Sequence, residues 1–96
     1  MSESIEFDEY KEAQRERRLK RLPIRTAEIL ALRSEGYRVV QKTEYHFRIN
    51  GTIDLWPIHN RFHILKTNQR GGAKNLAEFV RAYFNGRRYP HTTFNP

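Results

Sequence analysis

Apolar and polar positions along the first third of the chain predict two helices. Residues 7–22 (FDEYKEAQRERRLKRL) are rich in helix-forming residues, with acids in the first turn and bases in the last, an order that suits the helix dipole. The apolar positions of this segment form only a thin stripe, so we expect a charged helix that is exposed or docks weakly. Pro23 is expected to break it, and Thr26 to cap a second helix over residues 26–35 that ends at Gly36.

Alternation with a period of two predicts a strand over residues 37–47, with one face buried and the other wet. The Asn50-Gly51 pair is a hairpin signal, and a loop of about three residues that ends at Gly51 keeps apolar residues opposite apolar residues. The pairs predicted by that loop are Phe47 with Ile53 and Tyr45 with Leu55.

A second hairpin follows, because Trp56-Pro57 ends one strand and PIHN leads into another, RFHILK. A loop of about four residues closes an apolar face between these strands. The apolar pairs it predicts are Leu55 with Phe62 and Ile53 with Ile64. The wet face is then expected to hold His46 and His63 on either side of Asp54, Trp56 beside Arg61, and Arg48 beside Thr52.

The last part of the chain has the clearest helical pattern. Apolar residues recur at helical spacing from Leu76 to Phe84, and Asn85-Gly86 ends the helix. Together the elements predict an α+β domain, a three-stranded antiparallel meander packed by helices, with a basic helix at the N-terminus. Its predicted parts, all in one domain (1–96), are 1–22 (charged helix), 26–35 (helix), 37–66 (sheet), a polar loop TNQRGG, 73–85 (helix) and 86–96 (extended tail).

Length and composition exclude several classes of protein. A chain of 96 residues has room for one modest core, and without cysteine it has neither a disulfide nor a thiolate metal site. No apolar run reaches the roughly 18 to 20 residues that cross a bilayer, and the acidic start MSESIEFDEY is unlike a signal peptide. A soluble, cytoplasmic protein is expected.

Charge is distributed unevenly along the chain, which has a net charge of +7. Residues 1–10 are acidic, residues 11–25 and 61–96 are basic, and the stretch between them is neutral. Two basic blocks create a positive field that suits a phosphate backbone or an acidic protein surface. The alternative is that these side chains only solvate the surface.

Three residues of the predicted wet face are candidate metal ligands. His46, Asp54 and His63 would lie on neighbouring strands, roughly 5 Å apart, and imidazole with carboxylate suits zinc or iron. Ordinary pairing of a histidine with a carboxylate across strands explains the same pattern. No fourth ligand is visible, so no metal and no cofactor is expected.

The segment GTIDLWPIHNRFHILK followed by a helix resembles the core of the PD-(D/E)xK nucleases. In that family an Asp on one strand and an acid-x-Lys on the next hold a metal and activate water. The resemblance places Asp54 and Lys66 in the roles of the Asp and the Lys. Ile64 stands where the second acid belongs, and without that carboxylate a hard cation loses a main ligand.

The stretch YHFRINGTIDLWPIHNRFH with the following RGG resembles short proteins encoded by phages and other mobile elements. The resemblance covers about half the chain. It implies a context in which small single-domain proteins bind and inhibit host machinery, including CRISPR complexes, restriction enzymes and polymerases. This chain would differ from the acidic DNA mimics, because its charge has the opposite sign.

A binding function uses more of the sequence than any catalytic one. Basic side chains interleaved with aromatic ones suit nucleic acid, because phosphates take the charge and bases take the π faces. The predicted binding residues are Arg15, Arg17, Arg18, Lys20, Arg21, Arg48, Trp56, Arg61, Lys66, Arg70, Lys74, Arg87 and Arg88. Gly71-Gly72, between Arg70 and Lys74, is a further candidate for cradling one phosphate.

The prediction is therefore a non-enzymatic protein that binds nucleic acid or a nucleic-acid-containing complex. The first alternative is an inhibitor that grips an acidic patch on a host protein, anchored by Trp56 or Tyr89. The second is a metal-dependent nuclease, active or decayed.

Overall fold

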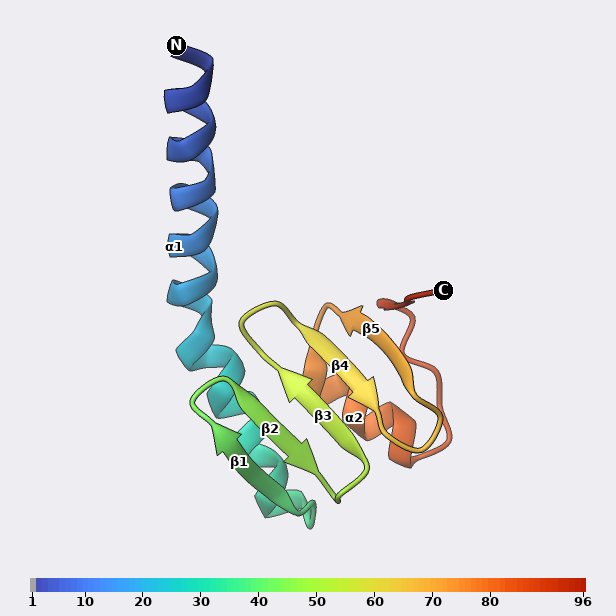
Figure 1. Cartoon of the computed structure of the whole chain (residues 1–96). Coiled ribbons are helices and arrows are strands. Elements are labelled where there is room, and N and C mark those ends of the chain that lie inside the picture. Colours follow the sequence, from blue (N-terminus) through green and yellow to red (C-terminus); the bar gives the residue numbers. More distant parts are fainter. Residues whose placement is uncertain (1) are drawn as a thin grey trace.

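The computed structural model describes residues 2–96, with side chains from Glu9 onward; Met1, the first residue of the predicted N-terminal helix, lies outside the described residues. The elements in chain order are α1 (Ser2–Ala31), the short 3₁₀ helix η1 (Leu32–Glu35), β1 (Val39–Thr43), β2 (His46–Ile49), β3 (Ile53–Trp56), β4 (Arg61–Ile64), β5 (Gln69–Ala73), α2 (Leu76–Phe84) and β6 (Thr92–Phe94). Figure 1 shows the first half of α1 projecting away from the rest of the molecule.

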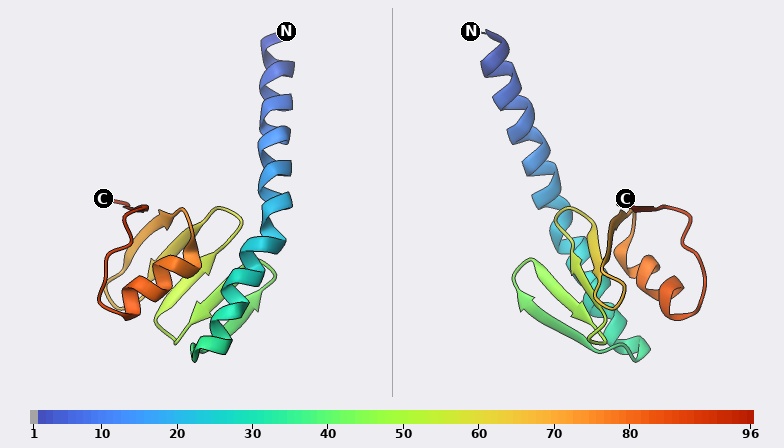
Figure 2. Two further views of the ribbon diagram at one scale, coloured as in Figure 1. Left: turned by 180° about the vertical axis from the view of Figure 1, so that it is seen from behind. Right: turned by 45° about the vertical axis from the view of Figure 1, so that its right-hand side comes forward.

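The six strands form one antiparallel sheet in which each strand pairs with its neighbour in sequence. The C-terminal part of α1, together with η1 and α2, covers one face of the sheet, and the other face is open (Figure 2). Alternation along the strands sends apolar residues to the covered face. The core there consists of Ile29, Leu32, Val39, Phe47, Ile49, Ile53, Leu55, Phe62, Ile64, Ala73, Leu76, Ala77, Phe79 and Val80.

The predicted break at Pro23 is wrong, because α1 continues through this residue as one helix of 30 residues. A proline inside a helix loses one backbone hydrogen bond and costs about 3 kcal/mol. The segment after Pro23 offsets this cost by burying Ile29 and Leu32 in the core. Gly36 does end the helical segment as predicted, with φ of 93° in the left-handed region.

The single strand predicted over residues 37–47 is two strands joined by a turn at Glu44 and Tyr45. The Thr43 hydroxyl accepts a hydrogen bond from the Tyr45 N–H at 3.2 Å, which stabilises this turn. The pattern missed the turn because it contains neither glycine nor proline. The first hairpin of the sheet therefore lies inside the segment that looked continuous.

The predicted register of the next hairpin is also wrong. Asn50 and Gly51 both have positive φ, 51° and 64°, and the Thr52 N–H donates to the Ile49 carbonyl at 2.9 Å. Positive φ at both central residues is typical of a type I′ turn. Thr52 is left as an extra loop residue, and the strand pairing is shifted by two positions relative to the predicted register. The observed pairs are Phe47 with Leu55, Arg48 with Asp54, and Ile49 with Ile53. Apolar residues still face apolar ones, so the pattern alone could not choose between the two registers.

The β3–β4 register is confirmed: Ile53 pairs with Ile64, Asp54 with His63, Leu55 with Phe62 and Trp56 with Arg61. The meander does not stop there, as the three-strand prediction required. Residues of the predicted polar loop form β5, and the predicted tail returns after α2 to add β6. The helix predicted over 73–85 is observed as the shorter α2, because Ala73 belongs to β5 and Asn75 is the N-cap.

Candidate nucleic-acid interface

The first part of the candidate site is a row of arginines on α1. A helix that continues through Pro23 brings Arg18, Arg21 and Arg25 to one face, at i, i+3 and i+7. Gln14 and Arg17 join them around a shallow hollow of about 240 Å³. Among the described side chains, Arg17, Arg18 and Arg21 are exposed and have no hydrogen-bond or ion-pair partner, so their charges are available to an external ligand.

Arg25 joins this row to the sheet. Its Nη1 donates to the carbonyl oxygens of Pro57 and Ile58, at 3.0 and 3.1 Å, and so ties α1 to the β3–β4 turn. Burial, followed by the neighbouring charge of Arg21, lowers the pKa of the Arg25 guanidinium; Glu28 acts in the opposite direction. Positive charge is therefore crowded at the point where α1 meets the turn.

A second hollow, of about 310 Å³, lies between α1 and the start of α2. Arg21 and Arg25 line it from one side, and Asn60 and Lys74 from the other. Its one acidic residue, Glu28, accepts a hydrogen bond from the Asn75 side chain at 2.7 Å. That carboxylate is therefore engaged within the protein.

Two more hollows continue the path onto the sheet. One, of about 370 Å³, shares Asn60 and Lys74 with the previous hollow and adds His59, Arg61 and Gly72. The other, of about 300 Å³, shares His59 and Arg61 and extends over the open face to Trp56, His63, Arg70 and Asn95. Both are free of acidic residues among their lining side chains.

The four hollows follow one another along a path on the surface, because each shares two lining residues with the next. Its lining residues come from α1 and from the end of the sheet where the β3–β4 turn lies, and Figure 1 shows that this turn lies beside α1. We call its seven basic residues the basic band: Arg17, Arg18, Arg21, Arg25, Lys74, Arg61 and Arg70.

Beside the band, the open face carries a cluster around Asp54, which is only 5% exposed. Arg48 binds its carboxylate with two hydrogen bonds, 2.7 and 3.0 Å long. His46 Nε2 lies 3.3 Å from Asp54 Oδ2 without the alignment of a hydrogen bond. Burial raises the pKa of Asp54, but the hydrogen bonds and charge of Arg48, together with His46, outweigh burial and leave that pKa below its ordinary value.

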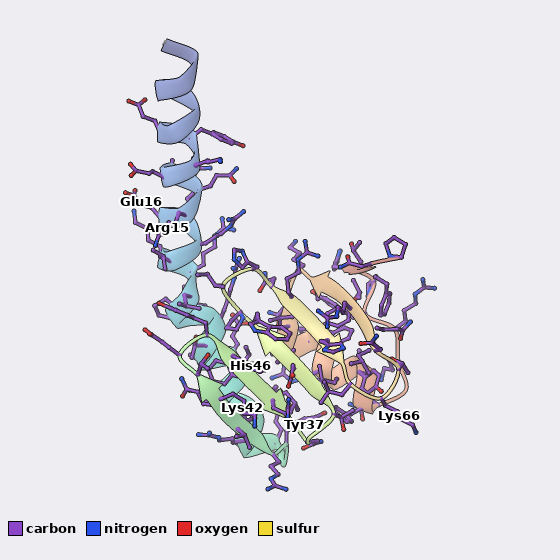
Figure 3. The ribbon with its side chains drawn as sticks, viewed as in Figure 1. Arg15, Glu16, Tyr37, Lys42, His46 and Lys66 are labelled. Carbon is purple, nitrogen blue, oxygen red and sulfur yellow. The ribbon has the colours of Figure 1, made fainter. Side chains whose placement is uncertain are left out.

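His46 also stacks on Trp56, with ring centroids 4.7 Å apart and planes inclined by 12°. Figure 3 shows His46 on the sheet face turned to the viewer, which is the open face. One face of the indole is therefore covered by an imidazole that is itself held near a carboxylate. This contact fixes the Trp56 ring in place.

The structure brings together only part of the predicted binding set. Arg48 lies beside Asp54 rather than beside Thr52 and is engaged by that carboxylate. Arg15 and Lys20 are exposed on α1 but do not line the hollows. Lys66 lies at the end of the sheet away from the projecting helix (Figure 3). Arg87, Arg88 and Tyr89 line a separate hollow beside α2.

The candidate phosphate loop at Gly71-Gly72 is a strand instead. A side chain at Gly71 would collide with the Thr93 carbonyl and lie 2.8 Å from the Phe62 ring, so this glycine permits close packing of β5. Gly72 lies beside the Arg61 side chain on the open face and lines a hollow of the path. The two glycines thus serve the sheet rather than the start of α2.

The candidate metal ligands share one face of the sheet but do not converge. His63 Nε2 lies 2.7 Å from Asn68 Oδ1, and Arg48 takes both oxygens of Asp54. In the part of the chain that the structure describes, no group of three or more His, Asp or Glu residues is arranged to hold a metal. Ile64, which stands where the nuclease resemblance requires the second acid, lies on the core face of the sheet, whereas Asp54 lies on the open face.

The sequence interpretation missed Arg25, His59, Asn60 and His91, all of which line the path. Arg25 was hidden by the assumed break at Pro23, since the i, i+3, i+7 spacing is visible only in a continuous helix. The other three are turn and tail residues, and no sequence pattern brings the β3–β4 turn beside the C-terminal segment.

No family model, curated protein or solved structure matches this chain. Among the described residues, the helices are too short or too polar to serve as a membrane span.

Proposed function

We propose that this protein is a non-enzymatic binding protein that holds nucleic acid along the basic band. The observation that supports it most directly is the continuity of the path, since seven basic residues line four adjoining hollows that contain one engaged carboxylate. A row of positive charges along adjoining hollows matches nucleic acid, which carries one phosphate per nucleotide.

The arrangement favours a polyanion over a single small anion. The basic residues come from α1, the β3–β4 hairpin, β5 and the segment before α2, so they are spread along a path rather than gathered at one point. The crowding of charge around Arg25 is relieved when a phosphate lies nearby. The open-face carboxylate, Asp54, is occupied by Arg48, and this supports binding rather than metal-assisted hydrolysis.

An acidic protein surface has the same charge as nucleic acid and would use the same band. A protein surface lacks the regular spacing of phosphates and has no nucleobases, so a binding assay with purified nucleic acid distinguishes the two kinds of partner. Capture of a protein partner that resists nuclease treatment, with weak binding to all nucleic acids, would favour the host inhibitor over the present proposal.

The test compares two variants that change the net charge equally. In the first, Arg17, Arg18 and Arg21 of the band are replaced by Gln. In the second, three exposed basic residues outside it, Lys66, Arg87 and Arg88, are replaced by Gln. Each variant removes three charges from the net +7. Binding to a labelled single-stranded and a labelled duplex DNA, and to RNA, is measured by fluorescence anisotropy across a salt series.

The band variant should bind more weakly, and its salt slope should fall in magnitude by roughly 2 to 3, because each of three lost phosphate contacts contributes roughly 0.7 (single strand) to 0.9 (duplex). The control variant should keep most of the affinity and most of the slope. Equal losses in both variants would mean that net charge alone attracts the ligand, and unchanged binding in the band variant would refute the band as the site.

A further inference from the structure

Trp56 marks the end of the basic band on the open face of the sheet. His46, on β2, covers one face of its ring. The hollow of about 300 Å³ that Trp56 lines is formed otherwise by β4, β5, the β3–β4 turn and Asn95, with no residue of β2. The hollow therefore lies on the β4 side of Trp56, whereas His46 stacks on the ring from β2.

The walls of this hollow combine three kinds of chemistry. Trp56 supplies a flat aromatic surface that the stack with His46 holds in place. Arg61 and Arg70 supply positive charge, with Arg70 free of side-chain partners among the described residues. The Asn95 amide, whose Oδ1 accepts from Arg61 Nη1 at 3.4 Å, has N–H donors left for a ligand.

The size of the hollow limits what enters it. About 300 Å³ lies at the lower end of the roughly 300 to 1,000 Å³ range of small-ligand pockets. This suits one heterocyclic ring with its sugar. A phosphate alone would contact the arginines but not the Trp56 ring, whereas a nucleobase would contact both.

We propose that the hollow beside Trp56 takes one unpaired base of a single-stranded nucleic acid, stacked on the free face of the indole, while the α1 part of the band holds the backbone. This inference rests on the proposed function and narrows it to single strands. Bases within a duplex are stacked on each other and cannot place a ring face against a side chain, so a duplex could meet only the α1 part of the band.

The experiment uses the fluorescence of Trp56, which is the one tryptophan of the chain. The protein is titrated with a 20-mer of deoxythymidine and, separately, with a hairpin duplex DNA of similar length. Stacking with a base quenches indole emission. We expect quenching that saturates with the single strand and little change with the duplex, even where anisotropy of a labelled duplex shows that it binds.

Two substitutions test the role of the ring. Trp56→Leu removes the aromatic surface and should weaken single-strand binding roughly 5- to 100-fold, with little effect on duplex binding. Trp56→Phe keeps a stacking surface and should retain most of the affinity. Thermal unfolding of both variants identifies a loss that comes from misfolding, because misfolding would weaken single-strand and duplex binding alike.

The outcomes separate this inference from the proposed function. Band-dependent binding of the single strand, without quenching and without loss in Trp56→Leu, would overturn the base pocket and leave the band intact. Equal quenching by single strand and duplex would also overturn it. Failure of every nucleic acid to bind, with wild-type folding intact, would overturn the proposed function itself.

Discussion

Replacing Gly71 by Ala tests the part of the sheet that lies beyond the predicted three strands. Gly71 is buried in β5, where it pairs with Phe62 of β4 on one side and with Phe94 of β6 on the other. A methyl group there would overlap the Thr93 carbonyl oxygen and lie 2.8 Å from Phe62 Cζ and 3.1 Å from Phe94 Cα. Two of these neighbours are backbone atoms of β6, so the strand has to move for the methyl group to fit.

The neighbouring Gly72 provides a matched control. A methyl group at Gly72 would lie 3.2 Å from the Asn60 carbonyl oxygen and 3.7 Å from the Arg61 Cδ, distances that a shift of a few tenths of an ångström accommodates. Neither glycine has positive φ, so alanine fits both backbone conformations. The two substitutions therefore differ in steric overlap and not in backbone entropy.

The overlap at Gly71 sets the expected size of the effect. Overpacking of a core position costs typically about 1 to 3 kcal/mol. The entropy gain of a Gly-to-Ala change applies at both positions, so the overlap sets the difference between the two variants. In a domain of this length each kcal/mol lowers the melting temperature by roughly 4 to 8 °C, so Gly71→Ala should melt roughly 4 to 24 °C below Gly72→Ala. For Gly72→Ala the loss of unfolded-state entropy favours folding by about 0.4 to 1 kcal/mol and offsets the mild crowding.

Circular dichroism measures both melting temperatures, and hydrogen exchange locates the change. The amides of Lys74 and Asn95, which donate to the carbonyls of His91 and Arg70 at 3.0 and 2.8 Å, report on the β5–β6 contact. Both should lose protection in Gly71→Ala and keep it in Gly72→Ala. Equal melting temperatures for the two variants, with both amides protected, would refute the packing of β6 described above.

Two further predictions concern single residues of the site and of α1. In Asp54→Asn, the free energy of unfolding should depend less steeply on pH below about 4 than in wild type. The lowered pKa of Asp54 gives stability that is present above the ordinary value of 3.8 and is lost as pH falls through the folded pKa. Equal slopes for the two proteins in urea titrations from pH 6 to pH 3 would contradict this. Pro23→Ala should raise the melting temperature and the helical signal at 222 nm. An alanine amide can donate to the Leu19 carbonyl, and proline in a helix interior is up to about 3 kcal/mol less favourable than alanine. A lower melting temperature would contradict this and mean that the proline ring holds α1 in its direction.

Sequence patterns predicted the strand pairing correctly where two clearly alternating strands are joined by a short turn. The β3–β4 register followed from two apolar pairs joined by a loop that begins with proline, and only one register satisfied both. The strands that were missed lack this signal. β5 reads QRGGA and β6 has only three residues, so their pairing depends on tertiary contacts such as the close approach at Gly71.

The candidate site was predictable in composition but not in arrangement. Charge along the sequence identified Arg17, Arg18 and Arg21, yet it gave equal weight to Arg87 and Arg88, which lie beside α2 and away from the path. What selects the band is the position of α1 against the β3–β4 turn. That position is held by Ile29 and Leu32 in the core and by hydrogen bonds from Arg25 to two backbone carbonyls, and the hydrogen bonds carry no sequence signature.

Pro23 and Arg25 lie two residues apart where the projecting half of α1 leaves the domain. Pro23 cannot donate to the Leu19 carbonyl, so the helix has one fewer hydrogen bond where it leaves the domain. Two residues later, Arg25 ties the helix to Pro57 and Ile58, in a place where the charge of Arg21 opposes its own. A phosphate at this corner would relieve that repulsion, and on the proposed function it would bind the folded arrangement and not the unfolded chain. If the band binds a polyanion as proposed, ligand binding and the attachment of α1 would be linked, because the ligand would offset the repulsion between Arg21 and Arg25 in the folded protein.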